Sequence, residues 1–345
     1  NYFVKGHSHI VKENTIFRID NFKNVLVLGS SLNLSILYRY VQDLGLNFFV
    51  ITSPDQEAEI EEKVPYKVFE KLDKHFIEFI QNRYHNNCTL FISLGSRWIF
   101  DSNIINLMGG NLVNFHCARL PFDAGGGGFS WRILKKDRIN TQLVHLVDSG
   151  IDTGPIITSY SSIFPSDCRI PQDFESYHLK SFEKFFMKFI SSLIKGESFS
   201  LKHQPNYIGS YYPRLETSIN SWINWSWDSD QIVDFINAFD SPYKGASTYI
   251  NNIRVRIRNV QLHGGELPSH PYMSGIISRK QKGWIVISTS DKFSLIVENV
   301  EIEDGSNIID SLYAGDRFYT DSDTLLESMT NRVKFGSNGI LKETK

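Results

Sequence analysis

The sequence has little of several features that define whole classes of protein. Its 345 residues include three cysteines, which are widely spaced and form no CxxC pair. Neither a disulfide framework nor a cysteine-rich zinc site is therefore expected. No apolar run approaches the roughly 18 residues of a membrane-spanning helix, and the first residues do not show the cationic and then apolar pattern of a secretory signal. These absences favour a protein of the reducing cytoplasm.

The chain also lacks an excess of charge of either sign. It has 36 Lys and Arg against 38 Asp and Glu, a net charge of −2, and 41% of its residues are hydrophobic. This balance is typical of a globular protein and disfavours a strongly basic nucleic-acid binder. At about 150 residues per domain, the length predicts two domains.

The first part of the chain alternates short apolar runs with helical patterns. Residues 25–30 read as a buried strand, and a helical repeat over residues 34–44 follows it. Further apolar runs lie at residues 48–52, 90–95, 112–115 and 141–147, and a long amphipathic helix is expected over 179–193. The predicted fold class is α/β, a Rossmann-like doubly wound parallel sheet. Gly29 ends the first strand without a GxGxxG motif, so no dinucleotide site is predicted there.

The last third of the chain has a different pattern. After a polar connector around residues 201–214 and a short helix near residues 229–239, alternating segments such as 253–258 and 284–289 dominate. They predict a small C-terminal antiparallel β-barrel of the OB-like kind. The expected organisation is an N-terminal extension over 1–22, a catalytic domain over 23–200, a linker with a helix over 201–242, the barrel domain over 243–335 and a tail over 336–345.

One constellation of residues carries chemistry. Asn114 and His116 end an expected strand two residues apart, so their side chains point to one face at the sheet edge where open α/β folds bind ligands. Asp152 lies in the loop after the next strand, within reach of the imidazole if the two strands are neighbours. Four consecutive glycines, residues 125–128, lie between them in the chain. Together these residues predict an active site with Asn114, His116 and Asp152 as catalytic residues.

These motifs resemble the formyltransferases that use N10-formyltetrahydrofolate, a family that includes methionyl-tRNA and nucleotide-sugar enzymes. The family's Asn-x-His corresponds to Asn114 and His116, its following Leu-Pro to residues 120–121, and the Asp of its Asp-Thr-Gly to Asp152. The resemblance spans residues 23–300. Ala118 and the glycine run depart from the family pattern, where a Ser and a basic loop are common, and this difference leaves the acceptor open.

The resemblance also implies a formyl donor, N10-formyltetrahydrofolate, and no metal. The residues that it assigns to the folate are Ser93, Gly95, Arg97, Trp98, Ile99, Val147, Asp148 and Gly150. The glycine run, Gly125, Gly126, Gly127 and Gly128, is expected to form a substrate loop. His7 and His9 lack a third candidate ligand nearby and are read as a solvated pair.

Charge favours a small acceptor over tRNA. Residues 201–345 carry 15 Lys and Arg against 17 Asp and Glu, whereas a tRNA-binding barrel should be basic. The counter-evidence is a strip of three alternating arginines, Arg254, Arg256 and Arg258. We therefore expect an N-formyltransferase acting on a nucleotide-linked amino-deoxysugar, dTDP-linked, for surface polysaccharide such as O-antigen, and working as a homodimer without nucleic acid or membrane. The alternatives are a methionyl-tRNA formyltransferase and a catalytically silent folate- or nucleotide-binding protein.

Overall fold

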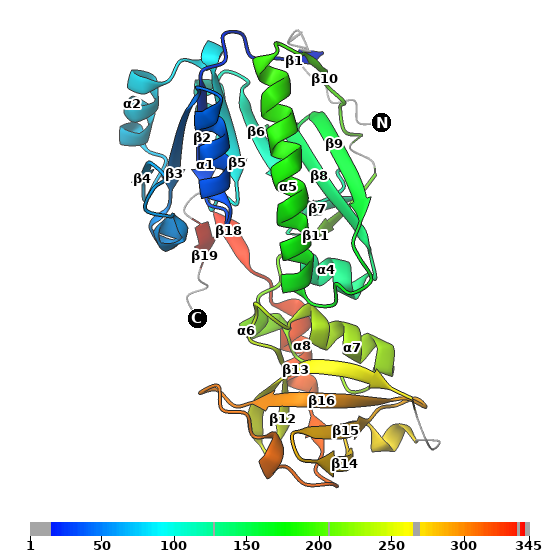
Figure 1. The fold of residues 1–345 in the computed structure, drawn as a ribbon. Coiled ribbons are helices and arrows are strands. Elements are labelled where there is room, and N and C mark those ends of the chain that lie inside the picture. The colour runs from blue at the N-terminus through cyan, green and yellow to red at the C-terminus, as the bar shows by residue number, and fades with distance from the viewer. Residues whose placement is uncertain (1–14, 127, 206–207, 265–269, 337–338, 342–345) are drawn as a thin grey trace, which may run out of the picture. The chain divides into compact units, whose positions relative to one another are not determined.

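The computed structural model of the chain describes residues 15–126, 128–205, 208–264, 270–336 and 339–341 (Figure 1). Its contacts divide the chain into two compact units, which we treat separately. The first unit comprises residues 1–116, 142–160 and 183–208, and the second comprises residues 117–141, 161–182 and 209–345. The division falls inside two strands and the longest helix, so neither unit is a continuous stretch of chain.

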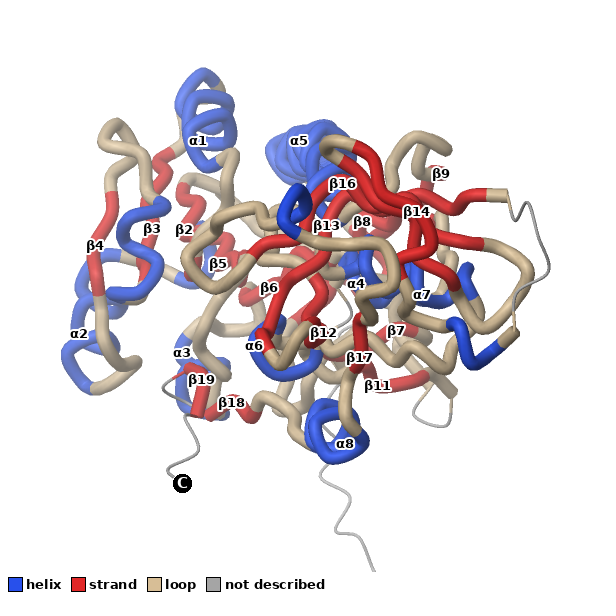
Figure 2. Tube along the Cα trace, turned by 90° about the horizontal axis from the view of Figure 1, so that it is seen from below, coloured by secondary structure: helices blue, strands red, loops and turns tan. Residues whose placement is uncertain are grey.

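A seven-stranded sheet dominates the first unit, in the order β4-β3-β2-β5-β6-β8-β9. Apolar β-branched and aromatic residues fill its central strands, as expected for a sheet covered on both faces. Figure 2 shows helices α1 and α5 over one face of the sheet and α2 and α3 over the other. The strands are β2 (Asn24–Gly29), β3 (Asn47–Thr52), β4 (Tyr66–Val68), β5 (Thr89–Leu94), β6 (Leu112–His116), β8 (Ile139–Leu146) and β9 (Ile156–Ile163). The helices are α1 (Leu34–Asp43), α2 (Lys74–Arg83), α3 (Ser102–Leu107) and α5 (Pro171–Ile194), and a small β1 (Ile16–Phe17) pairs with β10 (Phe199–Ser200).

The direction of β8 corrects the expectation of a wholly parallel sheet. Strands β2 to β6 are parallel to one another, but β8 runs antiparallel to β6, with Asn114 opposite His145 and His116 opposite Leu143. The mixed α/β class is confirmed, and the doubly wound pattern holds only for β2 to β6. The apolar run that predicted β8 carries no mark of strand direction, because strands buried on both faces look alike in either orientation.

The second unit contains a six-stranded antiparallel sheet in the order β14-β15-β16-β13-β12-β17. The sheet curls on itself, so that Ile276 beside β14 bridges to Arg317 beside β17. This half-barrel fits the expected antiparallel barrel, and its OB-like character remains a prediction. Its strands are β12 (Ala246–Ile250), β13 (Ile253–His263), β14 (Ile277–Gln281), β15 (Trp284–Ser288), β16 (Ser294–Glu301) and β17 (Phe318–Tyr319). The other elements are β7 (Asp123–Gly125), α4 (Phe129–Leu134), β11 (Ser210–Tyr212), α6 (Thr217–Asn220), α7 (Ser229–Ala238), α8 (Ser322–Thr330), β18 (Lys334–Gly336) and β19 (Gly339–Leu341).

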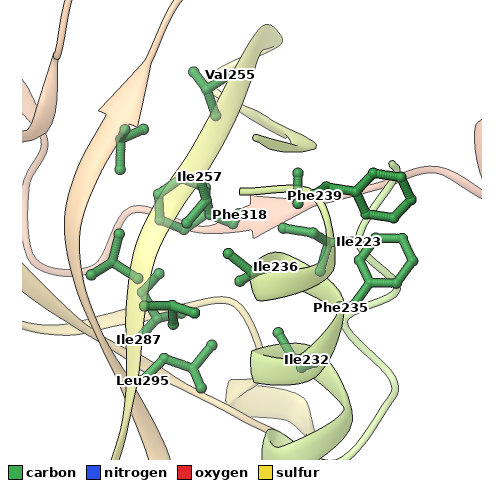
Figure 3. Close-up of a cluster of buried hydrophobic side chains, with 14 of the residues drawn as sticks. Ile223, Ile232, Phe235, Ile236, Phe239, Val255, Ile257, Ile287, Leu295 and Phe318 are labelled. Atoms are coloured by element: carbon green, nitrogen blue, oxygen red, sulfur yellow. The ribbon is translucent and has the colours of Figure 1, made fainter. Parts of the chain in front are cut away.

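Helix α7 anchors the hydrophobic core of the second unit. Its buried side chains Ile232 and Ile236 face the curled sheet, which contributes residues such as Val255 and Ile257 to the same core (Figure 3). The helix begins with a capping box, in which the Asp228 and Gln231 side chains bond each other's backbone N–H groups. The helix predicted near residues 229–239 is thus part of a domain core.

The predicted domain boundaries are not resolved by this division into units. The N-terminal extension up to residue 14, including the pair His7 and His9, and the tail residues 342–345 lie outside the described part of the chain. No described helix has the length and apolar character needed to cross a membrane.

Candidate active site

Strand β6 of the first unit places Asn114 and His116 on one face of the sheet, as the spacing predicted. Both residues are partly exposed, while Phe115 between them is buried against Phe185, Phe186 and Phe189 of α5. The aromatic side chain fixes which face of β6 turns inward, since adjacent residues in a strand point to opposite faces. The packing of Phe115 against α5 therefore sets the orientation of the Asn114 and His116 side chains.

His145 is a third polar side chain at this place, and sequence reasoning missed it. It lies on β8 directly opposite Asn114, and its side chain is 3% exposed. Its Nδ1 lies 2.7 Å from the carbonyl oxygen of Leu146, which can only accept, so Nδ1 carries the proton. Its Nε2 then accepts a hydrogen bond from the Asn114 amide at 3.2 Å. The signal available in the sequence was one polar residue in an otherwise apolar run, residues 143–147.

Asp152 completes the cluster from the loop after β8. One carboxylate oxygen lies 3.8 Å from His116 Nε2 and the other 3.8 Å from His145 Nε2. Asp152 adopts a left-handed backbone conformation, with φ of 56°, which is uncommon for a residue other than glycine. The Gln204 side chain holds this turn by donating to the carbonyl oxygens of Asp152 and Gly154 at 2.9 and 2.7 Å. We call Asn114, His116, His145 and Asp152 the Asn-His-His-Asp cluster.

The close approach of the loop to β8 requires a glycine at residue 154. A Cβ added there would lie 1.8 Å from the carbonyl oxygen of Leu146 and 3.5 Å from His145 Nδ1. No side chain fits at that distance, so the loop can fold back over β8 only with glycine at this position. The close approach brings Asp152 back beside the two histidines.

Burial keeps the His145 imidazole neutral. Burial is the largest cause that lowers the pKa of His145 from 6.5 to about 4, and the positive charge that His116 can carry lowers it further. The carboxylate of Asp152 acts in the opposite direction but is the weaker influence. At neutral pH His145 is therefore a hydrogen-bond acceptor that fixes the Asn114 amide, and it is not a proton donor from Nε2.

His116 is the member of the cluster with an unused hydrogen-bonding position. Its Nε2 atom is buried and has no hydrogen-bond partner among the described residues. A buried polar atom without a partner costs about 1–3 kcal/mol, so such atoms in native proteins call for an explanation. An imidazole nitrogen next to a carboxylate and an oriented amide can move a proton while the amide stabilises negative charge. The arrangement suits acyl-type transfer to an amine.

The residues assigned to the folate lie in two loops of the first unit. Ser93 lies on β5 opposite Asn114, and Gly95 has φ of 58° in the loop that follows. Trp98 is 5% exposed and belongs to the hydrophobic core, whereas Ile99 is 45% exposed. The folate contacts of these residues stay a prediction.

The other assigned residues have structural roles of their own. The Arg97 Nε atom lies 3.4 Å from an oxygen of Asp55, and Val147 packs against the core. Asp148 accepts from the backbone of Gly150 at 3.0 Å and from the hydroxyl of Thr153 at 2.6 Å, which shapes the loop that carries Asp152. These contacts explain the presence of Asp148 and Gly150 in the loop without a ligand. Their contact with folate stays a prediction.

The glycine run belongs to the second unit, and two of its glycines have a steric cause within the chain. A Cβ on Gly125, which has φ of 89°, would lie 2.4 Å from the ring of Tyr211. One on Gly126 would lie 2.7 Å from the backbone of Arg214. Both contacts come from the segment at β11, which pairs with β7. A Cβ on Gly128 would lie 4.0 Å from the carbonyl oxygen of Gly126, an ordinary van der Waals contact, and Gly127 lies outside the described residues.

Within the described part of the chain, no group of three or more His, Cys, Asp or Glu side chains is arranged to hold a metal ion. The three cysteines form no disulfide bond.

Comparison with known proteins finds similarity to formyltransferases. Residues 217–315 match the family described as formyl transferase, C-terminal domain. The methionyl-tRNA formyltransferase of Clostridium tetani is 22% identical over 246 residues, which are 71% of this chain and 76% of the relative.

The chain is thus similar to formyltransferases over most of its length, and residues 217–315 match their C-terminal domain. These matches confirm the expected class, a formyl-transferring enzyme. Two solved formyltransferases share the fold. One is WlaRD, described as a sugar 3N-formyltransferase in the presence of dTDP and 5-N-formyl-THF (TM-score 0.56, 21% identity, 81% of this chain and 98% of that one). The other is the N-formyltransferase of Helicobacter canadensis in complex with folinic acid and dTDP-3-aminofucose (TM-score 0.57, 20% identity, 80% and 99%).

Proposed function

We propose that this formyltransferase moves the formyl group of N10-formyltetrahydrofolate to the amino group of a nucleotide-linked amino-deoxysugar. The observation that carries the proposal is the Asn-His-His-Asp cluster. Its buried His116 Nε2 lies beside an oriented amide and a carboxylate and has no hydrogen-bond partner among the residues described. The cluster fits formyl transfer because it offers an amide for the developing oxyanion and an imidazole with a carboxylate for the proton. The donor complexes of the structural neighbours, with 5-N-formyl-THF and folinic acid, support the same assignment.

Asn114 is assigned to the formyl oxygen. One of its two amide protons goes to His145 Nε2, and the other is available for the oxyanion that develops when the amine attacks the formyl carbon. Removing one such donor costs about 10²–10³ in rate in well-studied acyl-transfer sites. His145 acts through Asn114, so we assign it a positioning role.

His116 and Asp152 are assigned to the proton. The attacking amine becomes cationic as the C–N bond forms, and it must lose a proton before the bond from the formyl carbon to the folate nitrogen breaks. His116 Nε2 is positioned to accept this proton, and Asp152 at 3.8 Å stabilises the imidazolium that results. The folate nitrogen leaves as a neutral amine once it takes up a proton, so the two proton movements balance. A positioned acid or base is worth roughly 10²–10⁴ in rate.

The choice of a sugar acceptor over tRNA rests on charge. Of the three arginines that could form a basic stripe, Arg256 pairs with Glu303 at 2.8 Å and Arg258 pairs with Glu301. Arg254 stacks on Trp222, with its guanidinium carbon 4.5 Å from the ring centroid. Two of the three charges are thus compensated within the half-barrel, and RNA binding depends on uncompensated cations.

The methionyl-tRNA enzyme remains the second candidate, because sequence relatives such as that of Clostridium tetani carry this name. A homodimer and a role in surface polysaccharide, such as O-antigen, are part of the proposal. Sedimentation at micromolar concentration that finds only monomer would contradict the dimer.

The test is a competition assay with N10-formyltetrahydrofolate as donor. Nucleotide-linked 3-amino- and 4-amino-dideoxysugars and charged initiator tRNA are offered together, and the products are read by mass spectrometry. We expect a formylated nucleotide sugar. Formylated methionyl-tRNA would overturn the acceptor and keep the assigned cluster, whereas the absence of any product would favour the silent binding protein.

A further inference from the structure

A small cavity in the second unit has a cationic lining. Its volume is about 180 Å³, and the side chains around it include Arg132, Lys136, Arg138 and Arg169. A water molecule occupies about 30 Å³ in the liquid, so the cavity has room for one tetrahedral anion and several waters. None of these residues belongs to the Asn-His-His-Asp cluster.

The two carboxylates in the lining do not neutralise it. Asp137 is engaged by Arg119 at 2.8 Å and by Arg132 at 3.4 Å. Asp234 lies 3.3 Å from Lys136 and is paired with it. Positive charge is therefore left over on the remaining two arginines.

The guanidinium groups of Arg138 and Arg169 form no ion pair among the residues that the structure describes, although the backbone N–H of Arg169 donates to the Asp173 carboxylate at 2.9 Å. Arg138 donates to the carbonyl oxygens of Cys168 at 2.7 Å and Phe164 at 3.3 Å. Arg169 donates to the carbonyl oxygen of Val260 at 2.6 Å. Carbonyl groups fix the direction of a guanidinium without cancelling its charge, and a guanidinium has five N–H donors, so donors remain for a ligand.

Two side chains of the lining are more than nine-tenths buried and bring further polar groups to the cavity. Arg132 is 3% exposed, and its Nε atom has no hydrogen-bond partner in the described part of the chain. Asn237 is 6% exposed and lines the same cavity from α7. Cys168, also in the lining, adds no negative charge, because burial raises the pKa of its thiol.

We propose that this cavity is a second ligand site, which binds a phosphoryl group. Guanidinium forks match phosphate oxygens in geometry as well as charge, and two guanidinium groups fixed by carbonyls are already ordered for that contact. The phosphoryl group is either inorganic phosphate or part of a nucleotide. A larger cavity of about 870 Å³ shares Lys136 and Asp234 with the small one and is lined by Trp131, Trp222 and Trp227, aromatic surfaces on which a base can stack.

The test is calorimetric titration of the full chain with inorganic phosphate, without folate or acceptor, so that its outcome is independent of the proposed formyl transfer. We expect saturable binding that weakens at least about tenfold in the double variant Arg138→Gln, Arg169→Gln, because each loses a charge-assisted contact. Arg317→Gln is the matched control. Its guanidinium also donates to a carbonyl, that of Tyr272 at 2.7 Å, and lies over an aromatic ring, but it is not in the cavity lining.

Circular dichroism and a melting curve check that the double variant folds. If the double variant does not fold, the single variant Arg169→Gln, at an exposed residue, provides the same test. Absence of phosphate binding at millimolar concentration, or equal binding by the wild type and the variant, overturns the proposal. A parallel titration with AMP separates the two sources. AMP that binds more tightly than phosphate and loses this advantage in Trp227→Leu identifies a nucleotide, and equal affinities identify inorganic phosphate.

Discussion

Two clusters of buried polar side chains, one in each unit, differ in how completely their groups are paired. In the second unit, the Asp123 carboxylate bonds Lys135 at 2.7 Å and Arg119 at 3.1 Å, and Arg119 also bonds Asp137 at 2.8 Å. We call these four residues the charge cluster. In the first unit, the Asn-His-His-Asp cluster leaves a buried nitrogen of His116 without a hydrogen bond and holds Asp152 in a strained conformation.

We attribute this difference to a structural role of the charge cluster and to the proposed catalytic role of the Asn-His-His-Asp cluster. Burial would raise the pKa of Asp123, but hydrogen bonds and charge from Lys135 and Arg119 together hold it below its usual value. Its environment is thus built to keep it ionised and paired. In the Asn-His-His-Asp cluster, the surrounding packing imposes the unused hydrogen-bonding position of His116 and the strained backbone of Asp152. Such features are frequent at functional sites. The predictions below test this contrast, from the largest expected effect to the smallest.

Asp152→Asn should cut formyl transfer by about 10²–10⁴, because the imidazolium of His116 loses its carboxylate. Stability should change little, since Asp152 makes no short ion pair with either histidine. Single-turnover kinetics and urea unfolding measure the two effects. Asp20→Asn, at an exposed residue, is the control. Undiminished turnover would remove Asp152 from the mechanism.

The His145 site should make stability fall on acidification. The unfolded chain binds a proton below pH 6.5, while the folded His145 does not until about pH 4, so stability present above pH 6.5 is lost between these values. The loss is up to roughly 3 kcal/mol, at 1.36 kcal/mol per pKa unit. Urea unfolding at pH 7 and pH 4.5 should show a smaller drop in His145→Gln than in the wild type. Equal drops would mean that His145 is protonated in the folded protein.

Asp123→Asn should produce the opposite pattern to Asp152→Asn. Two cations lose their shared partner, which costs 3–5 kcal/mol for a fully buried pair and roughly 1–3 kcal/mol here, because Arg119 and Lys135 are about one-third exposed. The fall should appear in urea unfolding, with catalysis on the folded fraction reduced far less than in Asp152→Asn. A variant as stable as the wild type would show that the charge cluster is not structural.

Gly125→Ala and Gly128→Ala form a pair that divides the glycine run. The first should destabilise the protein by about 1–3 kcal/mol, because its Cβ meets Tyr211 and its φ is 89°. The second would place its Cβ in ordinary van der Waals contact, 4.0 Å from the carbonyl oxygen of Gly126, and its stability should be within about 0.5 kcal/mol of the wild type. Only Gly128→Ala can therefore report on the substrate loop, and a raised KM for the acceptor with unchanged melting would support it.

Much of the site was visible in the sequence because it is local. Asn114 and His116 lie two residues apart on one strand, and alternation alone places them on one face. His145 was not visible as a site residue, because its partner is 31 positions away and only the pairing of β6 with β8 sets them opposite each other. The antiparallel direction of β8 was missed for the same reason.

The sequence by itself determined the elements, the Asn-x-His and Asp-Thr-Gly motifs and the resemblance to formyltransferases, since these depend on residue type and short spacing. Tertiary structure alone decided which polar groups are paired. Arg256 and Arg258 form part of a basic strip in the sequence but are ion-paired by Glu303 and Glu301 in the fold. Arg138 and Arg169 show no pattern in the sequence, yet their side chains line one cavity, and neither guanidinium group forms an ion pair among the described residues. Electrostatic pairing depends on distances between residues far apart in the chain, and folding alone sets those distances.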